Sequence, residues 1–322
     1  MNSAPVVILH TDNPEPALQI ATAAHPDLEF HTCDSYAALP QMIADTAAEV
    51  VYSVRFAGTP GFPRDATVNS ATVRWLSVGG SGTDHLGTWD SKRLTVTNAA
   101  GVAADMMAEY TLGAMLHFSL DLPGFRRAQK ERHWSAGKVE PIAGKTILIV
   151  GLGKTGQAIA QRCKALGLTV LGVRARPAPL DHVDVVQGMA DLPDLWPQAD
   201  FIAVCVPLLD STLGMIDATA IKMMKRNAVL IDVSRGGVVD QKALAQALQK
   251  NALKGAALDV FETEPLPEDS PFWEMPNVIV TPHCASVYDG WDLKSVRMFC
   301  DNLTRYRRGT PLLNIVDPMR GY

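Results

Sequence analysis

The chain has 322 residues, of which 47% are hydrophobic and 20% charged, and its formal net charge at pH 7 is −5. This length and composition allow two compact domains with buried cores. The acidic balance argues against a nucleic-acid partner, and no apolar run reaches the roughly 18 residues of a membrane span. Because there is no signal-peptide pattern and none of the five cysteines forms a C-x-x-C pair, we expect a cytoplasmic protein.

Short apolar runs rich in β-branched residues alternate with helical patterns along the whole chain. Such alternation predicts α/β domains whose parallel sheets are covered by helices on both faces. The predicted strands are residues 5–10, 49–54, 73–78, 94–97, 146–150, 168–173, 201–206, 228–233, 256–260 and 278–281. The predicted helices include residues 103–120, 154–167, 241–250 and 291–309.

Ten strands are many for one sheet, so we expect two doubly wound domains. The long helix after the sequence NAAG at residues 98–101 is the predicted first crossing between them. The predicted return follows the sequence TPHCAS at residues 281–286. One domain would then be discontinuous, with residues 1–98 and 289–322, and the other would comprise residues 99–288.

A glycine-rich stretch, TILIVGLGKTG at residues 146–156, joins a predicted strand to a predicted helix. Its glycines follow the spacing G-x-G-x-x-G. Gly151 would permit a tight turn, Gly153 would let the backbone approach a pyrophosphate, and Gly156 would allow close packing of helix on strand. The helix N-terminus would present free N–H groups to the anion. In this context the stretch predicts a dinucleotide site rather than an ordinary tight turn.

The end of the next predicted strand bears on which dinucleotide is bound. An NAD site usually has an acidic residue about 20 residues after the glycines, which binds the ribose 2′-hydroxyl. Arg174 stands at that place, and Arg176 follows two residues later. A guanidinium suits a 2′-phosphate, so we expect NADP(H) to be preferred. NAD(H) stays possible if both arginines are only solvated loop residues.

Three more segments follow predicted strands: DVSRGGVVD at residues 232–240, ALDVFETEPL at 257–266 and TPHCAS at 281–286. With the glycine stretch, they make the chain resemble the D-isomer-specific 2-hydroxyacid dehydrogenase family, which includes glyoxylate/hydroxypyruvate reductases and D-lactate, phosphoglycerate and formate dehydrogenases. The resemblance covers nearly the whole chain. It implies an oxidoreductase in which a Rossmann dinucleotide-binding domain, residues 99–288, is inserted into a discontinuous flavodoxin-like substrate domain.

The resemblance implies three catalytic residues and no metal. Reduction of a 2-oxo acid requires a hydride from the nicotinamide and a proton for the carbonyl oxygen, and histidine suits proton transfer near neutral pH. We expect His283 to donate this proton, and Glu264 to orient its imidazole. Arg235 would bind the substrate carboxylate and polarise the carbonyl. The product would be a D-2-hydroxy acid, and the reaction would be reversible.

Further cofactor contacts are implied by the same resemblance. Lys154 and Thr155 would contact the pyrophosphate. Asp259 would accept a hydrogen bond from the nicotinamide carboxamide, although a loop or helix cap is the alternative. The remaining cofactor residues implied are Val206, Pro207, Thr212, Val233, Ser234 and Ser286.

The substrate end of the predicted site is less sharply defined. The stretch SVGGSGTDH at residues 77–85 resembles the carboxylate-binding loop of the family, with the backbone N–H groups of Ser81 and Gly82 as the expected contacts. Arg55 could face the same ligand or lie on the surface. Arg174 and Arg176 resemble the arginine pair of the NADPH-using glyoxylate/hydroxypyruvate reductases. This resemblance implies a small 2-oxo acid such as glyoxylate or hydroxypyruvate, and a larger branched or aromatic 2-oxo acid is the alternative. Cys284 is either a reactive thiol or a packing residue.

Two expectations concern partners. The chain could instead be an NAD(H)-sensing binding protein, as corepressor-like members of the family are. The resemblance also implies a homodimer built through the cofactor domain. The predicted helix at residues 103–120 is apolar over much of its circumference, which fits such an interface but does not require one.

Overall fold

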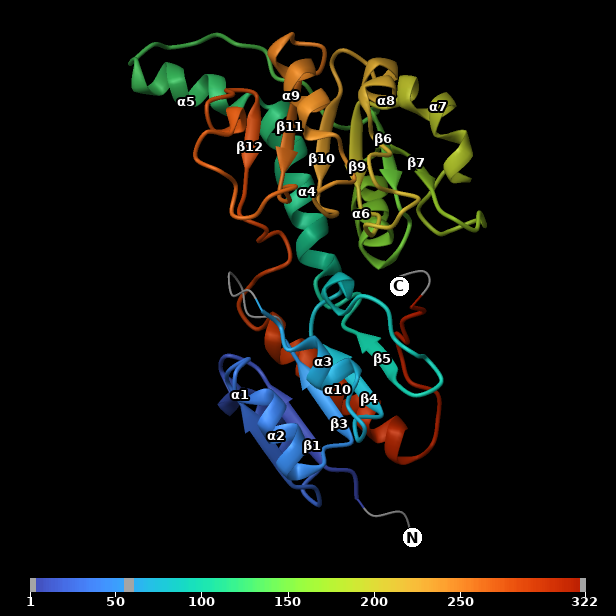
Figure 1. Cartoon of the computed structure of the whole chain (residues 1–322). Coiled ribbons are helices and arrows are strands. Elements are labelled where there is room, and N and C mark those ends of the chain that lie inside the picture. Colours follow the sequence, from blue (N-terminus) through green and yellow to red (C-terminus); the bar gives the residue numbers. More distant parts are fainter. Residues whose placement is uncertain (1–3, 55–60, 319–322) are drawn as a thin grey trace. The chain divides into compact units, whose positions relative to one another are not determined.

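The computed structural model describes residues 4–54 and 61–318, so Arg55 lies outside the described residues. The chain forms two compact units (Figure 1). The first unit comprises Met1–Val102 with Tyr288–Tyr322, and the second comprises Ala103–Val287. The sequence predicted one domain at residues 1–98 with 289–322 and another at 99–288. These bounds, as limits of independently folding domains, stay a prediction.

The first unit contains a five-stranded parallel sheet with helices on both faces. The strand order is β2-β1-β3-β4-β5. The strands are β1 (Val7–His10), β2 (Phe30–Cys33), β3 (Val50–Ser53), β4 (Trp75–Val78) and β5 (Thr95–Asn98). The helices α1 (Pro14–Ala24) and α10 (Trp291–Arg307) pack on one face, and α2 (Leu39–Thr46) and α3 (Arg64–Val68) pack on the other. Alternate strand residues therefore enter two separate apolar cores.

The second unit contains a seven-stranded parallel sheet in the order β12-β11-β10-β9-β6-β7-β8. The strands are β6 (Thr146–Val150), β7 (Thr169–Val173), β8 (Val185–Gln187), β9 (Phe201–Val204), β10 (Val229–Asp232), β11 (Gly255–Leu258) and β12 (Val278–Val280). The chain runs outward from β6 in one direction through β7 and in the other through β9. This reversal of strand order marks the place where sheets of this kind bind ligands, beyond the carboxyl ends of the strands.

Helices cover both faces of this sheet as well. The long helix α4 (Ala104–Ser119) and α6 (Lys154–Ala165) pack on one face, and α7 (Leu192–Leu195), α8 (Ala218–Met223) and α9 (Gln241–Gln249) pack on the other. A further helix, α5 (Leu122–Lys130), buries none of its residues. Short 3-10 turns lie at Asp84–Leu86, Met189–Asp191, Trp196–Gln198 and Pro271–Trp273.

The expected fold class is confirmed, with two parallel α/β sheets of five and seven strands. The sequence prediction missed two edge strands, β2 and β8. The sequence of β2, FHTC, mixes polar and apolar residues and is mostly half-exposed, and β8 has only three residues. Neither therefore shows the continuous apolar run of a central strand. Within residues 4–54 and 61–318, none of the helices combines the length and apolar character that a membrane span requires.

Candidate active site

The glycine stretch forms the turn between β6 and α6. Gly151 has a φ of +105°, and a Cβ atom there would lie 2.9 Å from Val206 Cγ1. A Cβ atom on Gly156 would lie 2.1 Å from the carbonyl oxygen of Gly151, so only glycine allows the helix to approach the turn this closely. Gly153, the N-cap of α6, has open space where a Cβ atom would be. The three positions therefore fit a pyrophosphate held against the backbone at the helix N-terminus.

The expected 2′-phosphate residues follow β7 directly. Arg174 is half-buried and its backbone N–H donates to the carbonyl of Gln187, while Arg176 is exposed. Neither guanidinium makes an ion pair with any residue in the described parts of the chain. The strand end thus carries two cationic groups and no carboxylate, which fits an anionic ligand group.

Other expected cofactor residues are used within the protein. Thr212 is 6% exposed, and its hydroxyl donates to the carbonyl of Pro207 at 2.6 Å and accepts from the N–H of Leu209 at 2.8 Å. It therefore closes the loop after β9. Lys154 is exposed, and Thr155 is half-buried with its hydroxyl 3.6 Å from Met107 Sδ. Val206 and Val233 are buried, and Ser286 is half-buried.

The loop after β10 carries Arg235. Asp232 ends the strand and is 1% exposed; its Oδ1 accepts from the N–H of Ser234 at 3.0 Å and from the hydroxyl of Ser234 at 2.5 Å. Burial raises the pKa of Asp232 to about 7. Arg235 is half-buried, and its Nη1 donates to the carbonyl of Ser234 at 2.7 Å. These bonds fix the backbone that presents the guanidinium.

Close backbone packing joins this loop to the loop after β11. A Cβ atom on Gly236 would lie 1.9 Å from the carbonyl oxygen of Phe261. Any larger residue would push the two loops apart. Glycine at this position therefore sets the spacing between the loop of Arg235 and the loop that continues to Glu264.

Glu264 and His283 form a hydrogen-bonded pair. His283 Nδ1 lies 2.8 Å from Glu264 Oε2, and Glu264 Oε1 accepts from the N–H of Phe261 at 3.0 Å. The carboxylate is thus held at both oxygens, and it orients the imidazole. Nδ1 faces Glu264, and Nε2 makes no hydrogen bond within the described part of the chain. Nε2 is therefore the nitrogen available to a ligand.

Both carboxylate oxygens of Asp259 accept hydrogen bonds from within the protein. It is 2% exposed, and its oxygens accept from the hydroxyl of Thr281 and from the N–H groups of Cys284 and Ala285. It caps the loop after β12, and its contact with a carboxamide stays a prediction. Cys284 is half-buried, and burial raises the pKa of its thiol, which disfavours a reactive thiolate.

The structure gathers Arg235, Glu264 and His283 at one edge of one sheet. They lie in loops that follow β10, β11 and β12, which are neighbours in the order β12-β11-β10 (Figure 1). Since carboxyl ends of parallel strands share an edge, the glycine turn after β6 lies at this edge too. Ser81 and Gly82 belong to the first unit, in the loop after β4, where the side-chain amide of Asn98 donates to the carbonyl of Ser81 at 2.7 Å.

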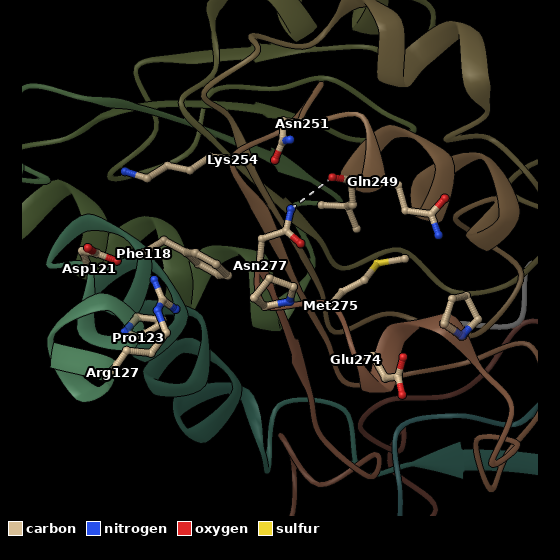
Figure 2. A pocket seen from close by; sticks show the side chains of 13 residues that line it. Phe118, Asp121, Pro123, Arg127, Gln249, Asn251, Lys254, Glu274, Met275 and Asn277 are labelled. Atoms are coloured by element: carbon tan, nitrogen blue, oxygen red, sulfur yellow. Dashed lines mark hydrogen bonds between the residues drawn. The ribbon is translucent and has the colours of Figure 1, made fainter. Parts of the chain in front are cut away.

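A pocket of about 580 Å³ lies elsewhere in the second unit (Figure 2). Lys254 and Asn277 line it, and they precede β11 and β12, so the pocket is at the opposite edge of the sheet from His283. Its side chains carry both signs of charge, from Arg127 and Lys254 to Asp121 and Glu274. This mixture defines no ligand class.

Sequence reasoning gave no role to several residues that the structure places in this site. Asp232 and Thr281 stand within the quoted motifs, but a side-chain role is not visible from spacing alone. Tyr110 lies 171 positions before Thr281, with its hydroxyl 2.8 Å from the threonine hydroxyl. No sequence signal links residues so far apart.

The fold and the site together define a dinucleotide-binding oxidoreductase with a histidine–carboxylate pair. Residues 112–285 match the model of the family described as "D-isomer specific 2-hydroxyacid dehydrogenase, NAD binding domain". The chain belongs to the D-isomer specific 2-hydroxyacid dehydrogenases, a family of NAD(P)-dependent oxidoreductases. The resemblance inferred from the motifs is therefore confirmed.

Named relatives are moderately similar in sequence. A D-3-phosphoglycerate dehydrogenase of Methanocaldococcus jannaschii is 31% identical over 79% of this chain and 49% of its own length. A glyoxylate reductase of Korarchaeum cryptofilum is 32% identical over 69% of each chain. The chain thus spans about half the length of the phosphoglycerate dehydrogenase that it matches.

Solved structures of the family are similar over almost the whole chain. A D-isomer specific 2-hydroxyacid dehydrogenase of Xanthobacter autotrophicus Py2, in complex with NADPH and MES, is 30% identical with a TM-score of 0.86, covering 99% of this chain and 100% of its own. An NADPH-dependent glyoxylate/hydroxypyruvate reductase of Sinorhizobium meliloti, in complex with NADP and sulfate, is 25% identical with a TM-score of 0.84 and the same coverage.

Proposed function

We propose that the protein reduces a 2-oxo acid to a D-2-hydroxy acid by reversible hydride transfer from NAD(P)H, with His283 as the proton donor. The observation that carries this proposal is the pair formed by His283 Nδ1 and Glu264 Oε2 at 2.8 Å. A histidine that is oriented by a carboxylate and has a free second nitrogen is suited to general acid–base catalysis. Family membership supports the same reaction class.

Each residue has a distinct part in the proposed reaction. The glycine turn would hold NAD(P)H, which would supply the hydride for the carbonyl carbon. The imidazolium of His283 gives the proton on Nε2 to the carbonyl oxygen, which completes the hydroxyl group. Glu264 keeps the ring in place through Nδ1, and Arg235 binds the substrate carboxylate through its planar set of donors. In the oxidative direction His283 accepts the proton.

NADP(H) is the proposed preferred cofactor, and NAD(H) the possible second one. Support comes from Arg174 and Arg176 at the end of β7, and from the two solved relatives that hold NADPH or NADP. We propose that the glycine turn binds the pyrophosphate. The other proposed contacts are Lys154, Thr155, Val206, Pro207, Thr212, Val233, Ser234, Asp259 and Ser286.

The proposed substrate is a small 2-oxo acid such as glyoxylate or hydroxypyruvate. A glyoxylate reductase and a glyoxylate/hydroxypyruvate reductase among the relatives support this choice. A larger branched or aromatic 2-oxo acid stays the alternative. The backbone N–H groups of Ser81 and Gly82, in the first unit, stay the sequence prediction for a substrate contact. A role for Arg55 stays a prediction from the sequence, and so does the cytoplasmic location.

We also propose a homodimer. The apolar side chains of α4 are mostly used within the second unit, against the sheet and α6. One exposed apolar surface of the second unit is α5 with residues 131–141, where Trp134 is 95% exposed and Val139 50% exposed. An aromatic side chain so exposed is suited to contact with a second copy of the chain.

The variant His283→Ala tests the role of the proton donor. We expect single-turnover hydride transfer to fall by about 10²- to 10⁴-fold while the Kd for NADPH changes by less than about twofold, because the histidine acts in the transition state. Stopped-flow absorbance and a fluorescence titration measure the two quantities. His31→Ala, in β2 of the first unit, is the matched control. Hydride transfer near the wild-type rate in His283→Ala would refute the assignment.

A further inference from the structure

The loop that carries His283 has an unusual backbone. His283 has a φ of +54°, in the left-handed region that residues other than glycine rarely adopt. Its ring is held by Glu264 through Nδ1, but this bond does not fix the backbone. A residue in such a conformation persists only when surrounding contacts hold it there. The N–H of His283 itself donates to the carbonyl of Thr281 at 3.0 Å, and further contacts are made by the residues just after it.

Asp259 supplies these contacts from the neighbouring strand end. Its Oδ1 accepts from the N–H of Cys284 at 2.9 Å, and its Oδ2 accepts from the N–H of Ala285 at 3.0 Å. These are the two N–H groups that directly follow His283. A carboxylate that is 2% exposed is stable only when its oxygens are bonded. The buried carboxylate and the turn therefore hold each other.

A third donor fixes Asp259 itself. The hydroxyl of Thr281 donates to Asp259 Oδ1 at 2.6 Å, and the hydroxyl of Tyr110 lies 2.8 Å from the same threonine oxygen. Thr281 has a single hydroxyl hydrogen, which goes to a carboxylate that can only accept. Tyr110 must then be the donor to Thr281. Burial raises the pKa of Tyr110 to about 12, so the phenol keeps its hydrogen.

We propose that Tyr110 and Thr281 are positioning residues that act through Asp259 to fix the backbone of His283. The order of donation is Tyr110 to Thr281 to Asp259, which polarises each hydroxyl toward the carboxylate. We call these three side chains the relay. It begins on α4, outside the loops that carry the chemistry. The inference rests on the proposed role of His283 as the proton donor.

The relay predicts graded losses in matched variants. Thr281→Val should raise the exchange rates of the Cys284 and Ala285 amides by about tenfold or more, and lower single-turnover hydride transfer about thirtyfold. Tyr110→Phe removes only the first donor and should lower hydride transfer about fivefold. In both, the KM for the 2-oxo acid and the Kd for NADPH should stay within about twofold of wild type. Thr281→Ser should restore most of the rate.

A control separates positioning from general packing. Thr111 is next to Tyr110 on α4, is buried, and donates only to the carbonyl of Met107 in its own helix. Thr111→Val should therefore leave both the amide exchange and the rate within about twofold of wild type. Equal losses in Thr111→Val and Tyr110→Phe would overturn the proposal. So would loosened amides in Thr281→Val with an unchanged rate, since the relay would then be structural only.

The experiment also distinguishes failure of the relay from failure of the proposed function. If the wild-type protein oxidises neither NADPH nor NADH with any 2-oxo acid, the proposed function fails. Amide exchange at Cys284 and Ala285, together with the imidazole ¹⁵N signals of His283, then decides whether the relay holds this residue. The proposal expects those signals to change in Thr281→Val and not in Thr111→Val, and the opposite pattern overturns it.

Discussion

Asp232, at the end of β10, is a single residue whose pKa depends on burial at the strand end. It is 1% exposed, and burial raises its pKa from 3.8 to about 7, against the bonds from Ser234, which lower it. Between about pH 4 and pH 7 the folded protein keeps a proton that the unfolded chain has lost. Asp232 therefore lowers the free energy of unfolding as the pH rises through this window, by about 1.4 kcal/mol for each pKa unit.

The variant Asp232→Asn tests this effect. An amide keeps the acceptor for Ser234 but cannot ionise, so the stability of the variant relative to wild type should increase from pH 4.5 to pH 7.5, by up to about 3 kcal/mol. Urea unfolding at both pH values measures the difference. Asp210→Asn, at an exposed position in the loop after β9, should show no such trend. A pH-independent difference for Asp232→Asn would contradict the argument.

Single residues also show where sequence reasoning succeeds and where it stops. The need for glycine at Gly151 and Gly156 could be predicted from the spacing G-x-G-x-x-G. A tight turn requires a positive φ at the first of these positions, and close packing of helix on strand leaves no room for a Cβ atom at the last. The pair of Glu264 and His283 followed from the family resemblance, and the structure shows their bond at 2.8 Å. The bonds of Asp259 could not be predicted, because a carboxylate at a strand end has several possible donors until the loops are folded.

Among the elements of the second unit, α5 and residues 131–141 are strongly exposed, although Glu140 donates its N–H to the carbonyl of Ser119 and pairs with Lys145. None of the residues of α5 is buried, and Leu122 is 46% exposed. The apolar circumference of α4 suggested an interface at that helix, but its buried face packs on its own sheet and on α6. We therefore expect the dimer contact to involve α5 and the segment after it.

The variant Trp134→Glu tests this contact. It should weaken dimerisation by at least about tenfold, because a charge replaces an aromatic anchor at an interface. Light scattering after size exclusion, over a range of concentrations, gives the mass and the dissociation constant. The control is Val185→Glu. Val185 is 38% exposed on β8, and β8 and β12 are the two outer strands of the sheet. This variant should leave the mass of the protein in solution unchanged. A monomeric wild type, or equal effects of both variants, would contradict the expectation.

Edge elements were the part of the fold that the sequence did not reveal. Central strands such as β6 (TILIV) are buried on both faces and read as continuous apolar runs. The edge strands β2 and β8 are half-exposed or short, so their pairing depends on neighbours that a local pattern does not contain. The long helices were predictable because their length and period are local properties.

At the scale of the whole molecule, two parallel sheets with helices on both faces could be predicted from the alternation of strands and helices alone. Substrate choice could not, because it depends on the shape of a site for which the sequence gives only candidate residues. Ser81 and Gly82 belong to one unit, and Arg235 and His283 to the other. The spacing of motifs along the chain defines the reaction class, and the size of the 2-oxo acid stays a prediction.

We propose that this chain is an NADPH-linked reductase of small 2-oxo acids. The most direct test is steady-state oxidation of NADPH and of NADH, at equal concentrations, by the purified protein with glyoxylate, hydroxypyruvate, pyruvate, phenylpyruvate and a branched 2-oxo acid. We predict turnover with NADPH at least about tenfold faster than with NADH, and fastest with glyoxylate or hydroxypyruvate. A clear preference for NADH would contradict the role of Arg174 and Arg176, and no oxidation with any pair would contradict the proposed function itself.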